Sequence, residues 1–401
     1  MFSGLACRLV IALALYAASA NATTYTAKSA YTGAWAAAST WTNDNGAWPG
    51  EGDDVLITNA GSTVTISGTT SNLNSLTNGG VLVFYNWNSI LHATNVTVTP
   101  GGRIYAAVWP TNETQSNNIH IACQTLVVQS GGAINANGRG YPGMYGGAGQ
   151  GPGGGSTAGV GGTYGGRGFG NGKIVYGNYA MPLEPGSAGG ASSTGTGMAG
   201  GGAIRIEAGG AVTVDGSITA DGDTYVAGYS TAGSGGGIYI QCDTISGNGL
   251  ISAAGGGNGD SGTWSKGGGG GRIAVLYNTT NQPGIQPVPS LMFRVCSALA
   301  TSTGTQVGEP GTLYFPDNYF LASPFRYTAQ WMVPGFTNWR VASLAMTNAS
   351  LWIPANGFAL TVSNDLRIVG TNEYLHQLRM IGGVVRVGGN IQMATSRVDL
   401  M

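Results

Sequence analysis

The acidic side chains that could do chemistry gather in one short stretch. Asp221 and Asp223 flank a glycine, and Asp260 lies about one repeat further along the chain. Such carboxylates could hold structural calcium, could cleave a polysaccharide by acid–base chemistry, or could form an Asp-Gly turn. Since Asp221 follows the apolar Ala220 in an alternating stretch, we expect its side chain to face solvent at a corner. A turn is the preferred interpretation, calcium bound by Asp221, Asp223 and Asp260 is the second, and catalysis is the third.

Other catalytic arrangements find little support. The three histidines are scattered, and no Ser-His-Asp or Cys-His pattern can be argued from their positions. The glycine runs lack the Gly-Lys-Ser/Thr ending that a phosphate-binding loop requires. The sequence therefore assigns no catalytic residue, and no cofactor other than the structural calcium considered above.

Tryptophans give a second set of candidates, because aromatic faces can stack on sugar rings. Trp35, Trp41 and Trp48 lie within fourteen residues near the start of the chain. We expect these three to seal the open end of the fold, with sugar contact as the rival interpretation. The candidate carbohydrate-binding residues elsewhere are Trp87, Trp109, Trp264 and Tyr164.

Internal repeats indicate the elements that must position these side chains. Ile204, Ile238 and Ile273 stand 34 and 35 residues apart in matching hexapeptides. Apolar residues alternate within each copy, and a period of two is typical of strands with one buried face. Strands this short cannot bury their apolar faces alone, so the copies must stack in parallel. The predicted fold is all-β: a right-handed parallel β-helix, or solenoid, with glycine-rich loop insertions.

Two cysteines test the predicted stacking order. Cys123 and Cys242 occupy the same slot after an Ile-x-Ile pattern, and the copy containing Ala208 lies between them. Adjacent strands lie about 4.8 Å apart, so two steps exceed the Cα separation of about 4.4–6.8 Å that a disulfide needs. We therefore predict that both thiols are free and that Ala208 fills the slot between them.

Composition narrows the class of protein. Glycine supplies 72 of the 401 residues without a three-residue period, which excludes collagen, while 42% apolar residues argue against uniform disorder. Only 8% of residues are charged and the formal net charge is −1, so no basic field exists to hold nucleic acid.

Residues 1–22 have the pattern of an export signal, with a short apolar run and cleavage expected after Ala20 or Ala22. No later stretch is apolar enough to span a membrane.

These patterns divide the chain into five parts. A signal peptide (1–22) precedes an entry or cap segment (23–60) and a glycine-rich β-helix (61–277). Residues 138–201 form a long glycine-rich insertion in that helix, which we expect to be a flexible loop or, alternatively, a ligand-facing flap. A proline-containing decorated stretch (278–340) and further coils (341–401) follow. We expect those last coils to be a piece cut from a longer protein, because strand-like sequence reaches the final residue.

The stretch GGGGGRIAVLY at 267–277 and the preceding IYIQCDTISGNGLISAAGG resemble the glycine-rich parallel β-helix modules of large secreted bacterial proteins. This resemblance implies a pectate-lyase-like fold with an adhesin-like or autotransporter-passenger-like role, and carries over no catalytic residue. The leading hypothesis is an exported, non-enzymatic surface protein, secreted or on the outer cell surface, that contacts an extracellular glycan or matrix component. The alternatives are a polysaccharide lyase or glycoside hydrolase on the same fold and, third, an ice- or mineral-binding face.

Overall fold

The computed structural model describes most of the chain from residue 22 onward. The described ranges are 22–43, 46–58, 61–108, 117–157, 159–193, 195–224, 231–257, 266–297, 307–321, 324–370 and 376–401. The predicted signal segment therefore lies almost entirely outside the described residues. No helix in these ranges is long and apolar enough to cross a membrane.

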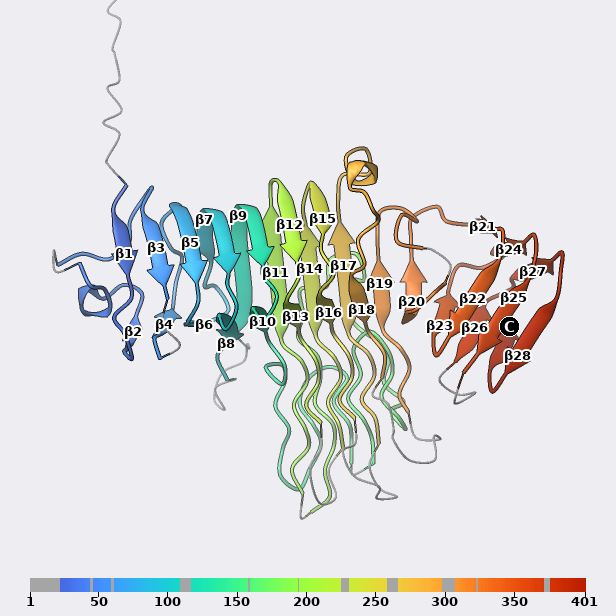
Figure 1. Ribbon diagram of the computed structural model, residues 1–401. Coiled ribbons are helices and arrows are strands. Elements are labelled where there is room, and N and C mark those ends of the chain that lie inside the picture. The colour runs from blue at the N-terminus through green and yellow to red at the C-terminus, as the bar shows by residue number, and fades with distance from the viewer. Residues whose placement is uncertain are drawn as a thin grey trace, which may run out of the picture.

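The molecule is an elongated stack of short β-strands (Figure 1). All the pairings between its named strands are parallel, and the chain passes repeatedly from one sheet to another. The arrangement is consistent with a parallel β-solenoid, which confirms the all-β, stacked part of the prediction. Within the described ranges, helix is limited to two short 3-10 turns, η1 (Ala38–Thr40) and η2 (Gln282–Gly284).

Fifteen strands form the long sheet, which runs through the whole stack. They are β1 (Thr24–Thr26), β3 (Asp54–Ile57), β5 (Leu73–Asn78), β7 (Leu91–Val98), β9 (Asn118–Val128), β11 (Ala203–Ala208), β12 (Ala211–Val214), β14 (Gly237–Gln241), β15 (Thr244–Ser246), β17 (Arg272–Leu276), β19 (Thr312–Tyr314), β20 (Thr328–Met332), β23 (Ser350–Ile353), β26 (Gln377–Met380) and β29 (Arg397–Leu400).

Eight strands form the second sheet, which faces the N-terminal and central part of the long sheet. They are β2 (Thr32–Ala34), β4 (Thr63–Ile66), β6 (Val81–Phe84), β8 (Arg103–Ala106), β10 (Ala133–Asn135), β13 (Ser217–Thr219), β16 (Leu250–Ser252) and β18 (Met292–Arg294).

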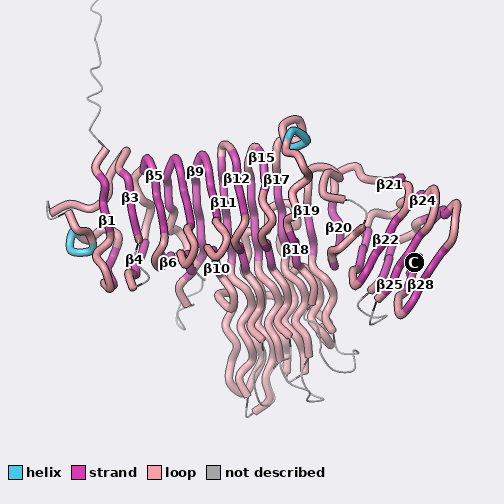
Figure 2. Tube along the Cα trace, in the orientation of Figure 1, coloured by secondary structure: helices cyan, strands magenta, loops and turns pink. Residues whose placement is uncertain are grey.

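The last part of the chain forms three coils of three strands each, here called the C-terminal coils. Each coil contributes one strand to the long sheet and one to each of two small sheets (Figure 2). The small sheets contain β21 (Asn338–Val341), β24 (Ala359–Val362) and β27 (Val384–Val387) in one, and β22 (Leu344–Thr347), β25 (Leu366–Val369) and β28 (Ile391–Ala394) in the other.

Ladders of identical or similar side chains make the core, as the repeats predict. Ile204 pairs with Ile119 on one side and with Ile238 on the other, and Ile238 pairs with Ile273. All four are fully buried, and burying such a side chain stabilises the fold by about 1.5–3 kcal/mol. Leu313 of β19 continues the same ladder, opposite Ile273. The domain boundaries drawn from the sequence stay a prediction.

The cysteine prediction is confirmed. Ala208 lies opposite Cys123 in the β9–β11 pair, and the β11–β14 register places Cys242 next to Ala208 on the other side. Both cysteines are free. Burial raises the pKa of each thiol to about 12.

Two of the three entry tryptophans seal the N-terminal end. Trp41 is completely buried, Trp35 is nearly so, and their rings meet edge to face with centroids 5.3 Å apart. The indole N–H of Trp41 donates to the carbonyl of Trp35 at 3.0 Å. Trp48 is half exposed and does not share this role.

Four connections from the second sheet to the long sheet form a feature that the sequence does not predict. They lie between β10 and β11, β13 and β14, β16 and β17, and β18 and β19. Figure 1 shows them as extended segments running side by side away from the strands. We call their described residues within 138–202, 220–236, 253–271 and 295–311 the glycine bundle. The interpretation of 138–201 as a flexible loop is therefore wrong, because its described backbone is hydrogen-bonded to neighbouring segments. The alternative of a ligand-facing flap stays a prediction.

Hydrogen-bond directions show how the glycine bundle packs. The amides of residues 268, 269 and 270 donate to three different segments, at the carbonyls of Gly256, Gly162 and Glu309. The amide of residue 271 donates to the carbonyl of Ala253, in the same segment as Gly256. A direction that repeats every third residue is that of an extended threefold helix of the polyproline II kind. Here neighbouring backbones take the place of the water that usually solvates such a helix.

Close approach of these backbones explains why the bundle is made of glycine. A Cβ added at Gly270 would lie 1.9 Å from the carbonyl oxygen of Val295 and 2.3 Å from the amide nitrogen of Gly311. No side chain fits at such distances, so only glycine permits the packing. The high glycine content of this part of the molecule is thus explained by the close packing of its backbone.

Candidate functional site

A notch opens where the glycine bundle ends and the C-terminal coils begin. Its cavity has a volume of about 700 Å³, and a smaller one of about 280 Å³ adjoins it through shared residues Glu309, Trp352 and Arg379. Both volumes together are of the size that small-molecule or oligomer sites have in proteins. The connection between β18 and β19 forms one wall, including Gly308, Glu309 and Pro310, while strands of the long sheet form the floor.

Two rows of outward side chains make the floor of the notch. In one row Gln330, Trp352, Arg379 and Asp399 follow one another across β20, β23, β26 and β29. Parallel pairing fixes their spacing at about 4.8 Å per strand, so the row is rigidly placed. The amide of Gln330 also donates to the carbonyl of Pro310 at 2.8 Å, which ties the floor to the wall.

The second row is polar and lies beside the first. Thr328 pairs with Ser350, and Gln377 pairs with Arg397. The amide of Ser350 donates to the hydroxyl of Thr328 at 3.1 Å, and the amide of Gln377 donates to the hydroxyl of Ser350 at 2.9 Å. These bonds join three successive coils at the corner where each coil enters the long sheet.

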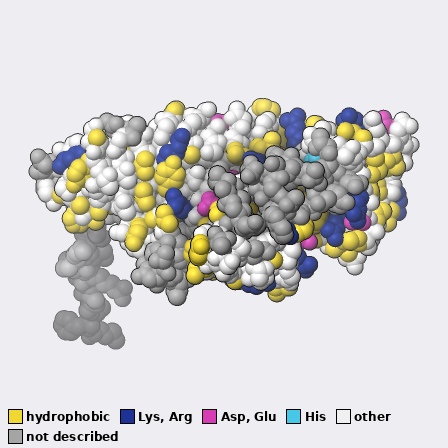
Figure 3. Space-filling view, turned by 90° about the horizontal axis from the view of Figure 1, so that it is seen from below, with side chains coloured by type: hydrophobic (Ala, Val, Ile, Leu, Met, Phe, Trp, Pro, Cys, Tyr) yellow, Lys and Arg dark blue, Asp and Glu magenta, His cyan; other side chains and the backbone are white. Residues whose placement is uncertain are grey.

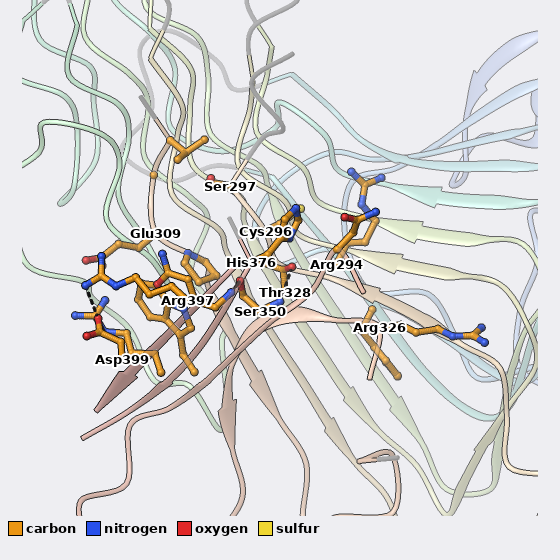
Figure 4. A pocket seen from close by; sticks show the side chains of 18 of the residues that line it. Arg294, Cys296, Ser297, Glu309, Arg326, Thr328, Ser350, His376, Arg397 and Asp399 are labelled. Carbon is orange, nitrogen blue, oxygen red and sulfur yellow. Dashed lines mark hydrogen bonds and ion pairs between the residues drawn. The ribbon is translucent and has the colours of Figure 1, made fainter. Parts of the chain in front are cut away.

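Two arginines are held at one end of the notch. The guanidinium of Arg379 lies 4.3 Å from the ring centre of Trp352, a cation–π contact. Asp399 lies between the guanidinium groups, 2.9 Å from Nη2 of Arg397 and 3.9 Å from Nε of Arg379. Figure 4 shows Arg397, Asp399 and Glu309 grouped on this side.

Arginines also stand at the other end. Figure 4 places Arg294 and Arg326 away from the Asp399 group, with the Arg326 side chain extending outward. Among the described residues, the cavity lining thus contains four arginines against two carboxylates, an excess of two positive charges. Dark blue side chains are visible on the part of the molecule that carries the C-terminal coils in the view from below (Figure 3).

The remaining titratable groups of the notch are held uncharged at neutral pH. Burial lowers the pKa of His376, which disfavours the imidazolium form. Burial raises the pKa of the Cys296 thiol, with Arg294 nearby acting in the opposite direction. The positive charge of the notch therefore comes from arginine alone.

Of the predicted carbohydrate-binding residues, the two that the structure describes, Trp87 and Tyr164, do not line this notch. Tyr164 is completely buried: its hydroxyl donates to Glu184 at 3.1 Å, and Arg272 lies over its ring. Its prediction as a sugar contact is wrong, because no sugar can reach either face of the ring. Trp87 is half-buried in the turn between β6 and β7, far along the stack from the notch. Trp109 and Trp264 lie outside the described residues.

The acidic stretch is a structural corner. Asp221 accepts hydrogen bonds from the hydroxyl of Ser252 and the amide of Ala254, and its own amide donates to Asn137 at 2.7 Å. It therefore ties together three successive coils. Its side chain is half-buried at this corner, and burial raises the pKa of its carboxyl.

Calcium binding stays a prediction. Asp223 is exposed and its carboxylate lies over Gly138, while Asp260 falls outside the described residues. Within the described ranges no group of three or more His, Cys, Asp or Glu side chains is placed to hold a metal ion.

Sequence reasoning missed the notch although part of its signal was readable. Leu351 and Ile353 point inward, so Trp352 between them must point outward, and the same alternation applies to Arg379 between Leu378 and Met380. What the sequence could not supply was the register that brings Trp352, Arg379 and Asp399 into one row, because the coils here lack the close repeats of the central part.

Comparisons with family models, with curated proteins and with solved structures gave no match.

Proposed function

We propose that this chain is an exported, non-enzymatic solenoid that binds an extracellular glycan in the notch. Its fold is a right-handed parallel β-helix of the kind found in secreted, adhesin-like bacterial proteins. The signal-like segment 1–22 directs it to the outside of the cell or to the outer surface. The resemblance of its repeats to such modules supports this compartment and role.

The observation that carries the proposal is the floor of the notch. Trp352 is a half-buried aromatic side chain in a row of polar residues, within a cavity of about 700 Å³. Sugar rings combine apolar faces with hydroxyl rims, and an indole beside hydroxyl and amide groups complements both. Because each side chain stands on a strand of a continuous sheet, the site is preorganised by the backbone.

The contacts of the two carboxylates favour binding over cleavage. Asp399 is ion-paired with Arg397 and Arg379, and Glu309 accepts the backbone amide of Arg167 at 3.3 Å. An inverting hydrolase needs one carboxylic acid and one free carboxylate about 6.5–9.5 Å apart. Carboxylates already engaged by arginine and by an amide serve that chemistry poorly.

The test is binding of purified protein to a panel of soluble polysaccharides, with Trp352→Ala as the variant. We expect an affinity loss of about tenfold or more, because stacking contacts of this kind are worth about 1–3 kcal/mol. Trp87→Ala is the matched control, since it removes a half-buried tryptophan on a distant turn. Unchanged binding in Trp352→Ala, or release of reducing ends from any polysaccharide, contradicts the proposal.

A further inference from the structure

We infer that the ligand of the notch is an anionic polysaccharide, carrying carboxylate or sulfate groups on successive sugars. This inference rests on the proposed function and goes beyond it by naming the chemical class of the glycan. It starts from a contrast in charge: the chain has a formal net charge of −1, yet four of its arginines line one cavity with only two carboxylates.

Arginine is suited to recognise such groups. Its planar guanidinium carries five N–H donors and pairs with carboxylate or sulfate oxygens through two parallel hydrogen bonds. Lysine, by contrast, offers a point charge without this fork. All the basic residues in the lining of the notch are arginines.

The arginines at the Asp399 end are held before any ligand arrives. Arg379 is fixed between the Trp352 ring and the Asp399 carboxylate, and Arg397 is fixed by the same carboxylate. A single carboxylate cannot satisfy the donors of two guanidinium groups. The pair therefore keeps both positive charge and hydrogen-bonding capacity, and little side-chain entropy is lost when a ligand anion binds.

The positions of the charges fit a polymer better than a single ion. Arg379 and Arg397 stand on the neighbouring strands β26 and β29, while Arg294 stands at the opposite end of the notch on β18 (Figure 4). A chain with a negative group on successive sugars can meet both ends at once. Trp352 lies on the floor between the two ends, with Arg379 over one face of its ring, and contacts the sugar beside the charged groups.

The experiment compares four soluble polymers: alginate, which carries carboxylates; dextran sulfate, which carries sulfates; neutral dextran; and single-stranded DNA. Wild-type protein should bind alginate or dextran sulfate and not dextran, and the preferred anion identifies the ligand group. Binding should weaken as salt rises from about 0.05 M to 0.5 M, because screening shortens the range of the charges.

Arg397→Gln should weaken binding of the anionic polymer by about tenfold, since it removes a charge-assisted hydrogen bond. Arg397→Lys should recover only part of the loss, because lysine keeps the charge without the fork. Arg386→Gln is the matched control: it makes the same charge change on an exposed residue of β27, outside the notch, and should leave binding unchanged.

The outcomes separate the two proposals. Binding of dextran that is lost in Trp352→Ala but insensitive to salt and to Arg397→Gln overturns the anionic ligand and keeps the glycan site. Failure of every polysaccharide to bind overturns both. Tighter binding of single-stranded DNA than of either anionic polysaccharide, or equal losses in Arg397→Gln and Arg386→Gln, also overturns the inference.

Discussion

The glycine bundle and the C-terminal coils solve the same packing problem in opposite ways. In the coils, large side chains such as Leu351, Leu360 and Leu378 are fully buried in the interior. In the bundle, glycines have no side chains, so neighbouring backbones come close enough for their amides to donate hydrogen bonds directly to each other's carbonyls, as around Gly270. One region is stabilised mainly by apolar burial, the other mainly by buried backbone hydrogen bonds.

This difference explains why the candidate binding site lies at the boundary between the bundle and the coils. The close approach of the glycine backbones leaves little room for side chains in the bundle, and Tyr164 inside it is fully buried. Apolar side chains inside the coils, such as Leu351, are buried as well. The notch forms at the boundary, where the bundle stops while the coils continue, so that a backbone wall faces two rows of outward side chains.

The largest effect that we expect comes from adding one methyl group to the bundle. Gly270→Ala should lower the free energy of unfolding by more than about 4 kcal/mol, because its Cβ would collide with backbone atoms that cannot move independently. Gly172→Ala is the control, since nothing lies within 4 Å of a Cβ there. Thermal unfolding measures both, and equal melting temperatures for the two variants would contradict the close packing described above.

Removing side-chain volume from the coils should cost somewhat less. Leu360→Ala leaves a cavity in a fully buried position, and we expect a loss of about 2–4 kcal/mol. Val384→Ala, at a position 44% exposed, should change stability by less than about 0.5 kcal/mol. A Leu360→Ala variant as stable as Val384→Ala would show that these coils do not depend on a side-chain core.

At the base of the bundle, Asp221 links three coils through hydrogen bonds. Asp221→Ala should cost about 2 kcal/mol, because the hydroxyl of Ser252 and the amide of Ala254 lose their acceptor. Asp221→Asn keeps an acceptor oxygen and should cost clearly less. Chemical denaturation of the three proteins decides the point, and an Asn variant as unstable as the Ala variant would count against these bonds.

The same carboxyl should make stability depend on pH in a defined direction. Burial raises the pKa of Asp221 above its ordinary value of 3.8, so the folded protein binds this proton more tightly than the unfolded chain does. That contribution to stability is present below pH 3.8 and is lost as pH rises through the raised pKa. The stability of wild type relative to Asp221→Asn should therefore fall as pH rises above 3.8, and a rise would show the opposite shift.

The smallest effect is expected at the thiols. Cys123 and Cys242 are free with pKa values of about 12, so a reducing agent should leave the melting temperature unchanged. An alkylating reagent should label these two thiols only after unfolding, since the reactive thiolate is scarce in the fold. Rapid labelling of Cys242 in the folded protein would place it at the surface.

Much of the stack was predictable because local patterns carry it. The alternation around Ile204, Ile238 and Ile273 predicts strands, and their spacing predicts the register that the long sheet has. The slot shared by Cys123 and Ala208 follows from the same count. These features depend only on the distance along the chain between equivalent residues.

The sequence by itself determined the parallel stacking, the buried faces of the strands and the separation of the two thiols. Long-range packing settles that the glycine-rich insertion is a hydrogen-bonded bundle, that Tyr164 is buried and Asp221 joins three coils, and that Trp352, Arg379 and Asp399 share one row. The physical reason is that strand alternation is a local property of the chain. The partners of a glycine backbone and the neighbours of an outward side chain, by contrast, belong to segments far away in the sequence.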